Sequence, residues 1–355
     1  MKKSLFRLLP TALLIIAALS LSACDNENYT EYGGSITSLD PAGMSAAEAR
    51  YEESSIVSSI EKAEKETTSL YEGAVIVPEL TPAVRTAADR EGGTAVIPEN
   101  VETIISAAPA ITEILVGLGA GDKIIAADTY SANVVGIDPA ICTLDFFNLD
   151  IEQLIMLDPD LIIISGMSVW GDEDPYTLLR DMGATVIYIP TSNSIEGIKL
   201  DIEFIGQMTG EEARAALLIS DINTKVLEVR ERVSELTKPT VYFEVEGLPA
   251  LYSCGSDTLI NELIEIAGGR NIYADENGWI QNSEESVIAA SPDFILSSVF
   301  YTGGMDISEV SNRPGWNIIP AVINGNVYAI DLNAVSRPSQ YIVDALEEIA
   351  DILHP

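Results

Sequence analysis

Two stretches of the chain share one pattern: IEQLIMLDPDLIIIS at residues 151–165 and EESVIAASPDFILSS at residues 284–298. In each, a Glu stands seven positions before a Pro-Asp pair, and an apolar run follows. The run DLIIIS has no polar alternation, which is typical of a parallel strand covered on both faces. The pattern therefore predicts a helix, a turn and a buried strand that occur once in each of two similar units.

The rest of the chain between residues 96 and 355 alternates in the same way. Strands are predicted at 101–108, 122–128, 160–165, 185–190, 240–246, 292–298 and 326–331. Helices are predicted at 112–118, 148–158, 176–183, 256–269, with Ser256 or Asp257 at its cap, 284–290 and 338–353. Alternating strands and helices indicate doubly wound α/β lobes.

A long helical stretch, 194–236, separates the two units, and Gly206 and Gly210 interrupt it. Its second helix, from Glu211 to Leu236, would be about 39 Å long at roughly 1.5 Å per residue. The expected fold is two doubly wound α/β lobes bridged by a long rigid α-helix. The predicted segments are a signal peptide (1–24), an acidic stalk (25–98), a first lobe (99–193), the bridging helix (194–238) and a second lobe (239–355).

The N-terminus has a positive start, an apolar run over residues 8–19 and the tetrapeptide Leu-Ser-Ala-Cys ending at Cys24. This is the pattern of a secretory signal. It resembles a bacterial lipobox, which implies lipidation of Cys24 and a membrane anchor that does not cross the bilayer. An ordinary signal peptide is the alternative. The stalk is expected to be partly disordered, with a partner-binding segment as the alternative.

The net charge of −36 over 355 residues argues against nucleic-acid binding and against direct adhesion to anionic lipid. His354 is the only histidine, so a protein-built zinc or manganese site is not expected. Cys142 and Cys254 fall in different predicted lobes, and we expect free or buried thiols because a bond between them would clamp the lobes together.

Four stretches together resemble a known family. They are IISAAPAITEILVGLGAGDKIIAADTYS, NLDIEQLIMLDPDLIIISG, GSDTLINELIEIAGGRNIY and ESVIAASPDFIL. In this order, with the long helix between the second and third, they are similar to solute-binding proteins of ABC importers for iron–siderophores, haem and cobalamin. The resemblance implies an extracytoplasmic protein with no cofactor and no catalysis. Its partners would be a two-subunit permease, the transporter's ATPase and a chelated iron or corrinoid ligand. Iron–siderophore is the first choice of ligand, then cobalamin, then haem.

The resemblance also assigns a role to the Glu of each repeated stretch. In the family, one surface Glu on each lobe docks into arginines of the two permease subunits, and Glu152 and Glu285 correspond to these positions. The alternative is that both carboxylates simply favour helix N-termini.

Ligands of open α/β sheets bind at the carboxyl ends of the strands. The candidate ligand contacts that follow predicted strands are Tyr130, Phe146, Phe147, Trp170, Glu244, Phe300, Tyr301 and Arg337. Tyr130 could instead be a surface turn residue, or an axial ligand if the chelate is haem. Trp170, Phe300 and Tyr301 could pack a lid. Arg337, which the family pattern directs at acidic groups of the ligand, could instead pair with a carboxylate such as Glu244 or Glu246.

Two other classes remain open on the sequence. Chelatases and metal-cluster reductases share the two-lobed architecture, but the chain has no nucleophile elbow, phosphate loop or cysteine cluster. A surface receptor or chelate-storage lipoprotein without a permease is the third possibility.

Overall fold

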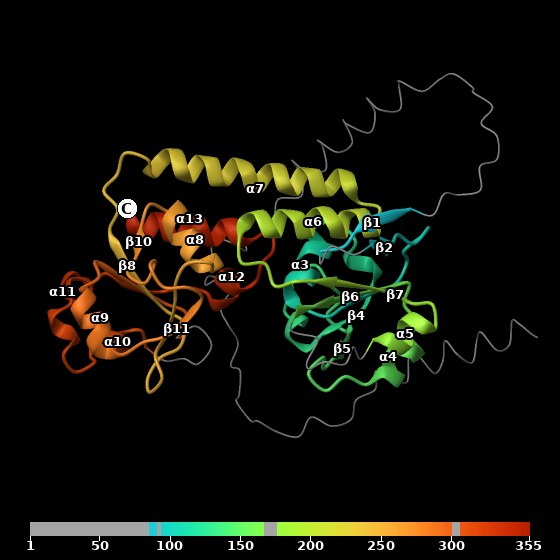
Figure 1. Cartoon of the computed structure of the whole chain (residues 1–355), viewed down its shortest axis with the longest axis horizontal. Helices are drawn as coiled ribbons and strands as arrows, with labels where there is room; N and C mark the ends of the chain where they lie inside the picture. Colours follow the sequence, from blue (N-terminus) through green and yellow to red (C-terminus); the bar gives the residue numbers. More distant parts are fainter. Residues whose placement is uncertain (1–84, 91–93, 167–175, 300–305) are drawn as a thin grey trace, which may run out of the picture. The chain divides into compact units, whose positions relative to one another are not determined.

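The computed structural model describes residues 85–90, 94–166, 176–299 and 306–355, which belong to one compact unit. The predicted α/β fold is confirmed: two parallel sheets are each covered by helices (Figure 1). The predicted signal peptide, Cys24 and the stalk up to residue 84 lie outside the described residues. Within the described ranges, no helix combines the length and the apolar character that a membrane span requires.

The first lobe contains a five-stranded parallel sheet in the order β5-β4-β3-β6-β7. Its strands are β3 (Ile104–Ser106), β4 (Ile124–Asp128), β5 (Cys142–Leu144), β6 (Leu161–Ser165) and β7 (Thr185–Ile189). Its helices are α3 (Pro109–Gly117), α4 (Ile151–Leu157), α5 (Thr177–Asp181) and α6 (Ile195–Thr209). The strand order reverses between β3 and β6, which is the position where such sheets bind ligands.

The second lobe contains a four-stranded parallel sheet in the order β10-β8-β12-β13. Its strands are β8 (Thr240–Glu244), β10 (Arg270–Asn271), β12 (Phe294–Ser297) and β13 (Val327–Ala329). Its helices are α8 (Leu259–Ile266), α9 (Glu284–Ala290), α10 (Ser308–Ser311), α11 (Pro320–Asn324), α12 (Leu332–Ser336) and α13 (Ile342–Leu353). The sequence analysis did not predict the antiparallel pair of β9 (Tyr252–Cys254) and β11 (Trp279–Gln281).

The strand β6 is buried on both faces, as its unbroken apolar sequence predicts. Leu161 and Ile163 pack into the core shared with α3 and α6, whereas Ile162 and Ile164 pack into the core on the other face, with residues of α4 and α5. Alternating strand residues point to opposite faces of a sheet, so helices on both sides are needed to cover this strand.

The repeated stretch forms the same local structure in both lobes. The short helices α4 and α9 both end in a left-handed residue, Asp158 and Ser291, before the Pro-Asp turn. In the first lobe Asp160 Oδ2 accepts from the Thr103 N–H at 2.9 Å and the Thr103 hydroxyl at 3.0 Å, and its own N–H donates to Thr103 Oγ1 at 3.0 Å.

Asp293 makes the matching contacts with Thr240 in the second lobe. Its Oδ2 accepts from the Thr240 N–H at 2.8 Å and the hydroxyl at 2.7 Å, and its N–H donates to Thr240 Oγ1 at 3.0 Å. Each Thr–Asp pair thus joins the amino-terminal ends of two adjacent strands, β3 with β6 and β8 with β12. These are the two strands between which the order reverses in each sheet, so the repeat builds the centre of each lobe.

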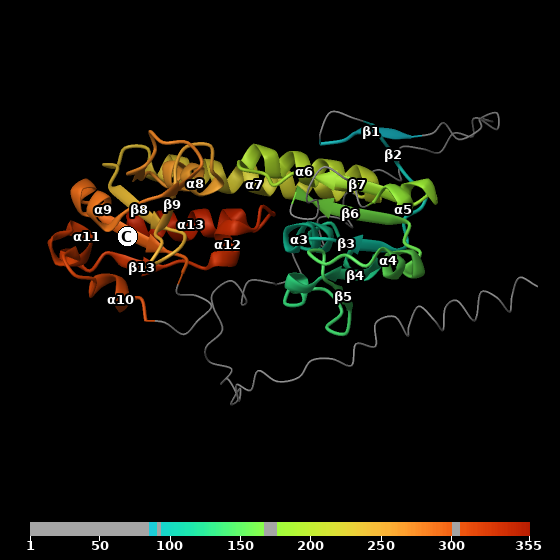
Figure 2. The same cartoon turned by 60° about the horizontal axis from the view of Figure 1, so that its bottom comes forward.

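The predicted bridging segment forms two antiparallel helices, and only the second runs along both lobes (Figures 1 and 2). The helix α6 ends at Gly210, whose φ of +77° is left-handed. The helix α7 (Glu212–Val233) then turns back over it, and its 22 residues span about 33 Å. Gly206 lies inside α6 and allows the close approach of α7, since a Cβ there would come within 2.7 Å of the Ala215 methyl.

Two ion pairs attach α7 to the second lobe. Lys225 Nζ lies 3.2 Å from Asp344 Oδ1, and Arg232 Nη1 lies 2.8 Å from Asp351 Oδ1, both on α13. The apolar core is continuous as well, since one cluster includes side chains of α3, α6, α7, α8 and α13. Of the two helices, α7 therefore runs along both lobes, whereas α6 packs with the first lobe and meets the second where the Ile195 N–H donates to Glu262 Oε2 at 2.7 Å.

Two further details differ from the sequence-based prediction. Thr258, rather than Ser256 or Asp257, caps α8 by accepting from the Asn261 N–H at 3.3 Å. The hairpin β1 (Thr86–Ala88) and β2 (Thr94–Val96) lies within the predicted stalk, yet Arg90 pairs with Asp201 of α6. Cys254 is a free, buried thiol, as the sequence analysis expected. The two cysteines are therefore not bonded to each other.

Candidate ligand site at the carboxyl ends of the strands

Two exposed aromatic side chains stand at the carboxyl ends of neighbouring strands in the first lobe. Tyr130 lies in the 3-10 turn after β4 and is 64% exposed, and Phe147 follows β5 and is 48% exposed. Their rings meet edge to face with centroids 6.4 Å apart. An exposed aromatic pair offers apolar area at low entropic cost to a bulky partner.

Two aspartates hold the backbone beneath these aromatic residues. Asp128 accepts from the Tyr130 N–H at 2.8 Å, and Asp145 accepts from the Phe147 N–H at 2.9 Å. The same motif, a carboxylate bonded to the N–H two residues later, therefore orients both aromatic residues.

The two aspartates differ in protonation behaviour. Burial raises the pKa of Asp128 above its ordinary value, and the Asp145 charge adds to the rise, against the opposing effects of the Tyr130 N–H and Arg337. Exposed Asp145 accepts a hydrogen bond from the Asn148 side chain at 2.8 Å. That bond is the main reason the pKa of Asp145 lies below its ordinary value. Asp145 is therefore a stable negative charge at this edge.

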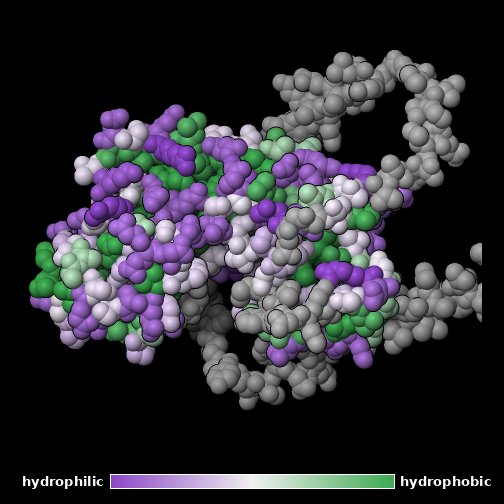
Figure 3. Space-filling model, in the orientation of Figure 1, coloured by the Kyte–Doolittle hydropathy of each residue, from purple (hydrophilic) through white to green (hydrophobic). Residues whose placement is uncertain are grey.

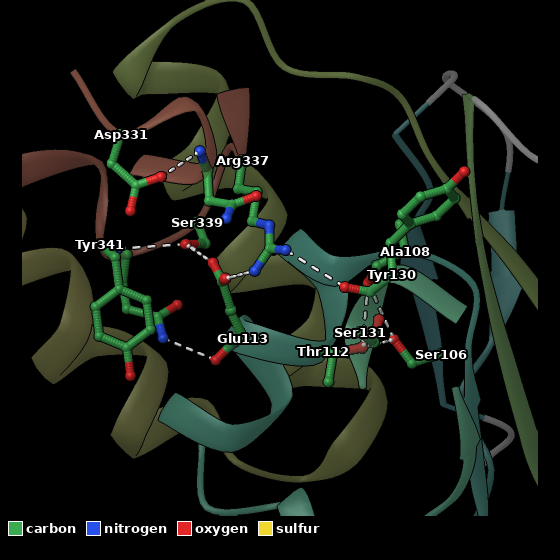
Figure 4. A network of polar contacts seen from close by, with 12 residues as sticks. Ser106, Ala108, Thr112, Glu113, Tyr130, Ser131, Asp331, Arg337, Ser339 and Tyr341 are labelled. Carbon is green, nitrogen blue, oxygen red and sulfur yellow. Dashed lines mark hydrogen bonds and ion pairs between the residues drawn. The ribbon is translucent and has the colours of Figure 1, made fainter. Parts of the chain in front are cut away.

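Arg337 of the second lobe reaches the same edge of the first lobe (Figure 4). Its Nη1 lies 2.8 Å from Glu113 Oε1 on α3, and its Nη2 donates to the Tyr130 carbonyl at 3.3 Å. Ser339 Oγ donates to Glu113 Oε2 at 2.6 Å, and Gln340 Nε2 donates to the Glu113 carbonyl at 2.7 Å. Of the two roles the sequence left open for Arg337, the structure shows the ion pair, and its partner is Glu113 rather than Glu244.

Glu244 is fully buried at the end of β8 in the second lobe. Arg313 holds it with both terminal nitrogens, Nη2 at 3.1 Å from Oε1, and Ser297 Oγ lies 3.2 Å from Oε1. Phe146 is 4% exposed and packs in the core of the first lobe. These placements correct the assignment of Glu244 and Phe146 as ligand contacts, because neither side chain reaches the surface.

Three further residues were predicted as ligand contacts. Trp170, Phe300 and Tyr301 lie outside the described residues, in the connections that follow β6 and β12. Residues that the sequence reasoning missed are Glu113, Ser339 and Gln340. Glu113 is visible in the sequence AITEIL, but nothing in one sequence indicates that it pairs with a residue 224 positions later.

The described residues also form hollows away from this edge. A hollow of about 440 Å³ is lined by Tyr273, Asn282 and neighbours beside α9, and one of about 340 Å³ lies along α7. The surface in Figure 3 is largely hydrophilic, with apolar patches that include the side of α7. Among the described residues, no group of three or more His, Cys, Asp and Glu side chains could hold a metal ion.

Comparison with known proteins identifies the family of this architecture. A family model for periplasmic binding proteins matches residues 104–334. The chain belongs to the periplasmic binding protein family. Over 258 residues it is 30% identical to an uncharacterized ABC transporter substrate-binding lipoprotein of Bacillus subtilis, covering 71% of this chain and 80% of that protein.

Two solved structures of this family agree with the fold. A possible iron-binding periplasmic solute-binding protein from Staphylococcus epidermidis is 29% identical, with a TM-score of 0.66 and coverage of 72% of this chain and 100% of that one. A periplasmic vitamin B12 binding protein of Vibrio cholerae is 25% identical, with a TM-score of 0.59 and coverage of 72% and 98%. The resemblance inferred from the four sequence stretches is confirmed at the level of the family.

Proposed function

We propose that this periplasmic binding protein captures a chelated metal compound between its two lobes and delivers it to the permease of an ABC importer. The observation that carries the proposal is the repeated unit. Glu152 and Glu285 both occupy the second position of a seven-residue helix, after a capping Asp150 or Ser283, and both are exposed. Two equivalent anions suit a partner built from two equivalent subunits.

The chemistry of these two positions supports docking. The pKa of Glu285 lies below its ordinary value, because its carboxylate accepts hydrogen bonds from its own backbone N–H and from the Ser283 hydroxyl. Exposed, ionised carboxylates can form charge-assisted pairs with arginines, which orient a partner and speed the encounter. The Thr–Asp pair that follows each helix joins two adjacent strand ends in both lobes, which supports an equivalent placement of the two helices.

The ligand class follows from the aromatic pair and from the relatives. Tyr130 and Phe147 offer exposed ring surface to a bulky ligand. The compared relatives are named for iron and for vitamin B12. We keep the order of iron–siderophore, then cobalamin, then haem. Lipidation of Cys24 and an extracytoplasmic location belong to the same proposal, supported by the lipobox-like sequence and by a relative named as a lipoprotein.

A transport assay tests the docking role. Glu152→Lys and Glu285→Lys, singly and together, are compared in vesicles that contain the cognate permease and ATPase. Each reversal should reduce uptake about tenfold or more, while ligand binding in solution stays unchanged. Glu228→Lys, at an exposed position on α7, is the matched control. Full uptake by the double variant would contradict the docking assignment.

A binding assay tests the ligand role. Purified protein is titrated by calorimetry with a ferric siderophore, a cobalamin and haem. Tyr130→Ala and Phe147→Ala should each weaken binding of the true ligand by about tenfold, the scale of one lost aromatic contact. Absence of binding to all three compounds would remove the proposed ligand class.

A further inference from the structure

The charged residues around the candidate site indicate the net charge of the chelates that it can bind. The described residues that follow the carboxyl ends of the parallel strands are 107–108, 129–131, 145–149, 166, 176, 190–194, 245–251, 272–278, 298–299, 306–313 and 330–337. They include seven Asp or Glu residues and two Arg, with no Lys.

Both of these arginines are already neutralised. Arg313 is buried against Glu244, whose side chain is 0% exposed, and its guanidinium lies 4.7 Å from the centroid of the Trp316 ring. Arg337 is held by Glu113, with the side chains 18% and 11% exposed. A third arginine, Arg90, reaches the start of α6 after β7, where it is neutralised by buried Asp201.

The described carboxylates at this edge have no comparable partner. Asp145 is exposed next to Phe147 and is bonded to an amide and a backbone N–H, neither of which carries a positive charge. Asp128 lies behind Tyr130, and Glu246 is exposed after β8. The local charge is therefore negative, in the same sense as the net charge of −36.

On these grounds, and resting on the proposed function, we infer that the ligand carries no net negative charge. An anionic chelate would approach unpaired carboxylates without a cation to receive it, and it would have to displace Glu113 from Arg337 to obtain one. Uncharged chelates, such as ferric hydroxamates and uncharged corrinoids, would contact the aromatic side chains without repulsion from the carboxylates. Cationic chelates would be attracted by the carboxylates as well. Ferric catecholates, ferric citrate and haem are excluded by the same reasoning.

Two matched sets of probes test the inference on the full chain by calorimetry. The first is a ferric linear trihydroxamate whose free end is an ammonium, an acetamide or a succinamide carboxylate, so that the net charge is positive, zero or negative. The second is a corrinoid in its aqua, cyano and monocarboxylate forms, with the same three charges. On the scaffold that binds, the anionic member should bind at least about tenfold more weakly than the uncharged one.

Variants locate the effect. Asp145→Asn should narrow the difference between the anionic and uncharged probes by several-fold, whereas Glu228→Asn, on the exposed face of α7, should leave it unchanged. Equal or tighter binding of the anionic probe overturns the inference while leaving the proposed transport function in place. Failure of every member of both scaffolds to bind overturns the proposed ligand class, and the charge inference with it.

Discussion

At the residue scale, the second lobe is organised around a buried ion pair. Glu244 is the last residue of β8 and forms an ion pair with Arg313, whose guanidinium lies against the Trp316 ring. Ser297 of the neighbouring strand β12 adds a hydrogen bond at 3.2 Å. The pair therefore lies where the strand order of the second sheet reverses, and it links that point to the segment after α10.

Removing one member of a buried pair leaves the other charge without compensation. Glu244→Ala should lower the free energy of unfolding by about 3–5 kcal/mol, measured by urea denaturation. Glu246→Ala, two residues further along the chain and exposed, should change the free energy of unfolding by about 0.5 kcal/mol or less. Similar losses of unfolding free energy in the two variants would show that the buried pair contributes no more to stability than an exposed carboxylate.

Cys254 provides a probe of the packing of the second lobe. Burial raises the pKa of its thiol to about 12, and the side chain is fully buried. Because the thiolate is the reactive form, alkylation at neutral pH should be at least about 100-fold slower in the folded protein than in urea. Mass spectrometry of the labelled peptide measures this rate. Rapid labelling of the folded protein would contradict the buried position.

At the element scale, the repeated helix, turn and strand is held by a Thr–Asp pair in each lobe. Burial acts to raise the pKa of Asp160, but hydrogen bonds from Glu102 and Thr103 outweigh it, and the net pKa is lowered. A carboxyl group with a lowered folded-state pKa stabilises the fold above its unfolded pKa and loses this contribution as the pH falls through the folded pKa.

Asp160→Ala should therefore lower the free energy of unfolding by about 1–3 kcal/mol at pH 7. The difference from the unmodified protein should shrink below about pH 4, where the carboxyl becomes protonated. Urea denaturation across this pH range measures both effects. Asp181→Ala, at an exposed helix end, is the control, and a loss independent of pH would argue against a role for the charge.

At the scale of the whole molecule, the lobes are connected by α7 and by the Glu113 network. The helix contributes a continuous apolar core and ion pairs to α13. Glu113 contributes a carboxylate that accepts from both Arg337 and Ser339 of the other lobe. The network lies beside Tyr130, so the candidate ligand site and the contact between the lobes share residues.

Glu113→Ala should lower the free energy of unfolding by about 1–3 kcal/mol, since it leaves Arg337 without its carboxylate. Amide hydrogen exchange at residues 337–341 should become faster, because Ser339 loses its acceptor as well. Lys225→Ala, which removes an ion pair between α7 and α13, should leave exchange at residues 337–341 unchanged. Unaltered exchange in Glu113→Ala would contradict a role for Glu113 in holding this segment.

The sequence by itself determined the two-lobed α/β architecture and the position of most helices and strands of the repeat. Apolar runs such as residues 161–164, the Pro-Asp turns and the glycine at 210 act locally, so their effect can be predicted from a few neighbouring letters. The equivalence of Glu152 and Glu285 was readable for the same reason, because each helix is specified by its own cap and turn.

Only the tertiary structure decided which side chains reach the candidate site. Glu244 and Phe146 follow strands just as Tyr130 and Phe147 do, but the fold buries the first two and exposes the others. The partner of Arg337 comes from α3 of the other lobe, 224 positions away. Pairing and burial at such separations depend on how the two lobes pack along α7, which no local pattern in the sequence encodes.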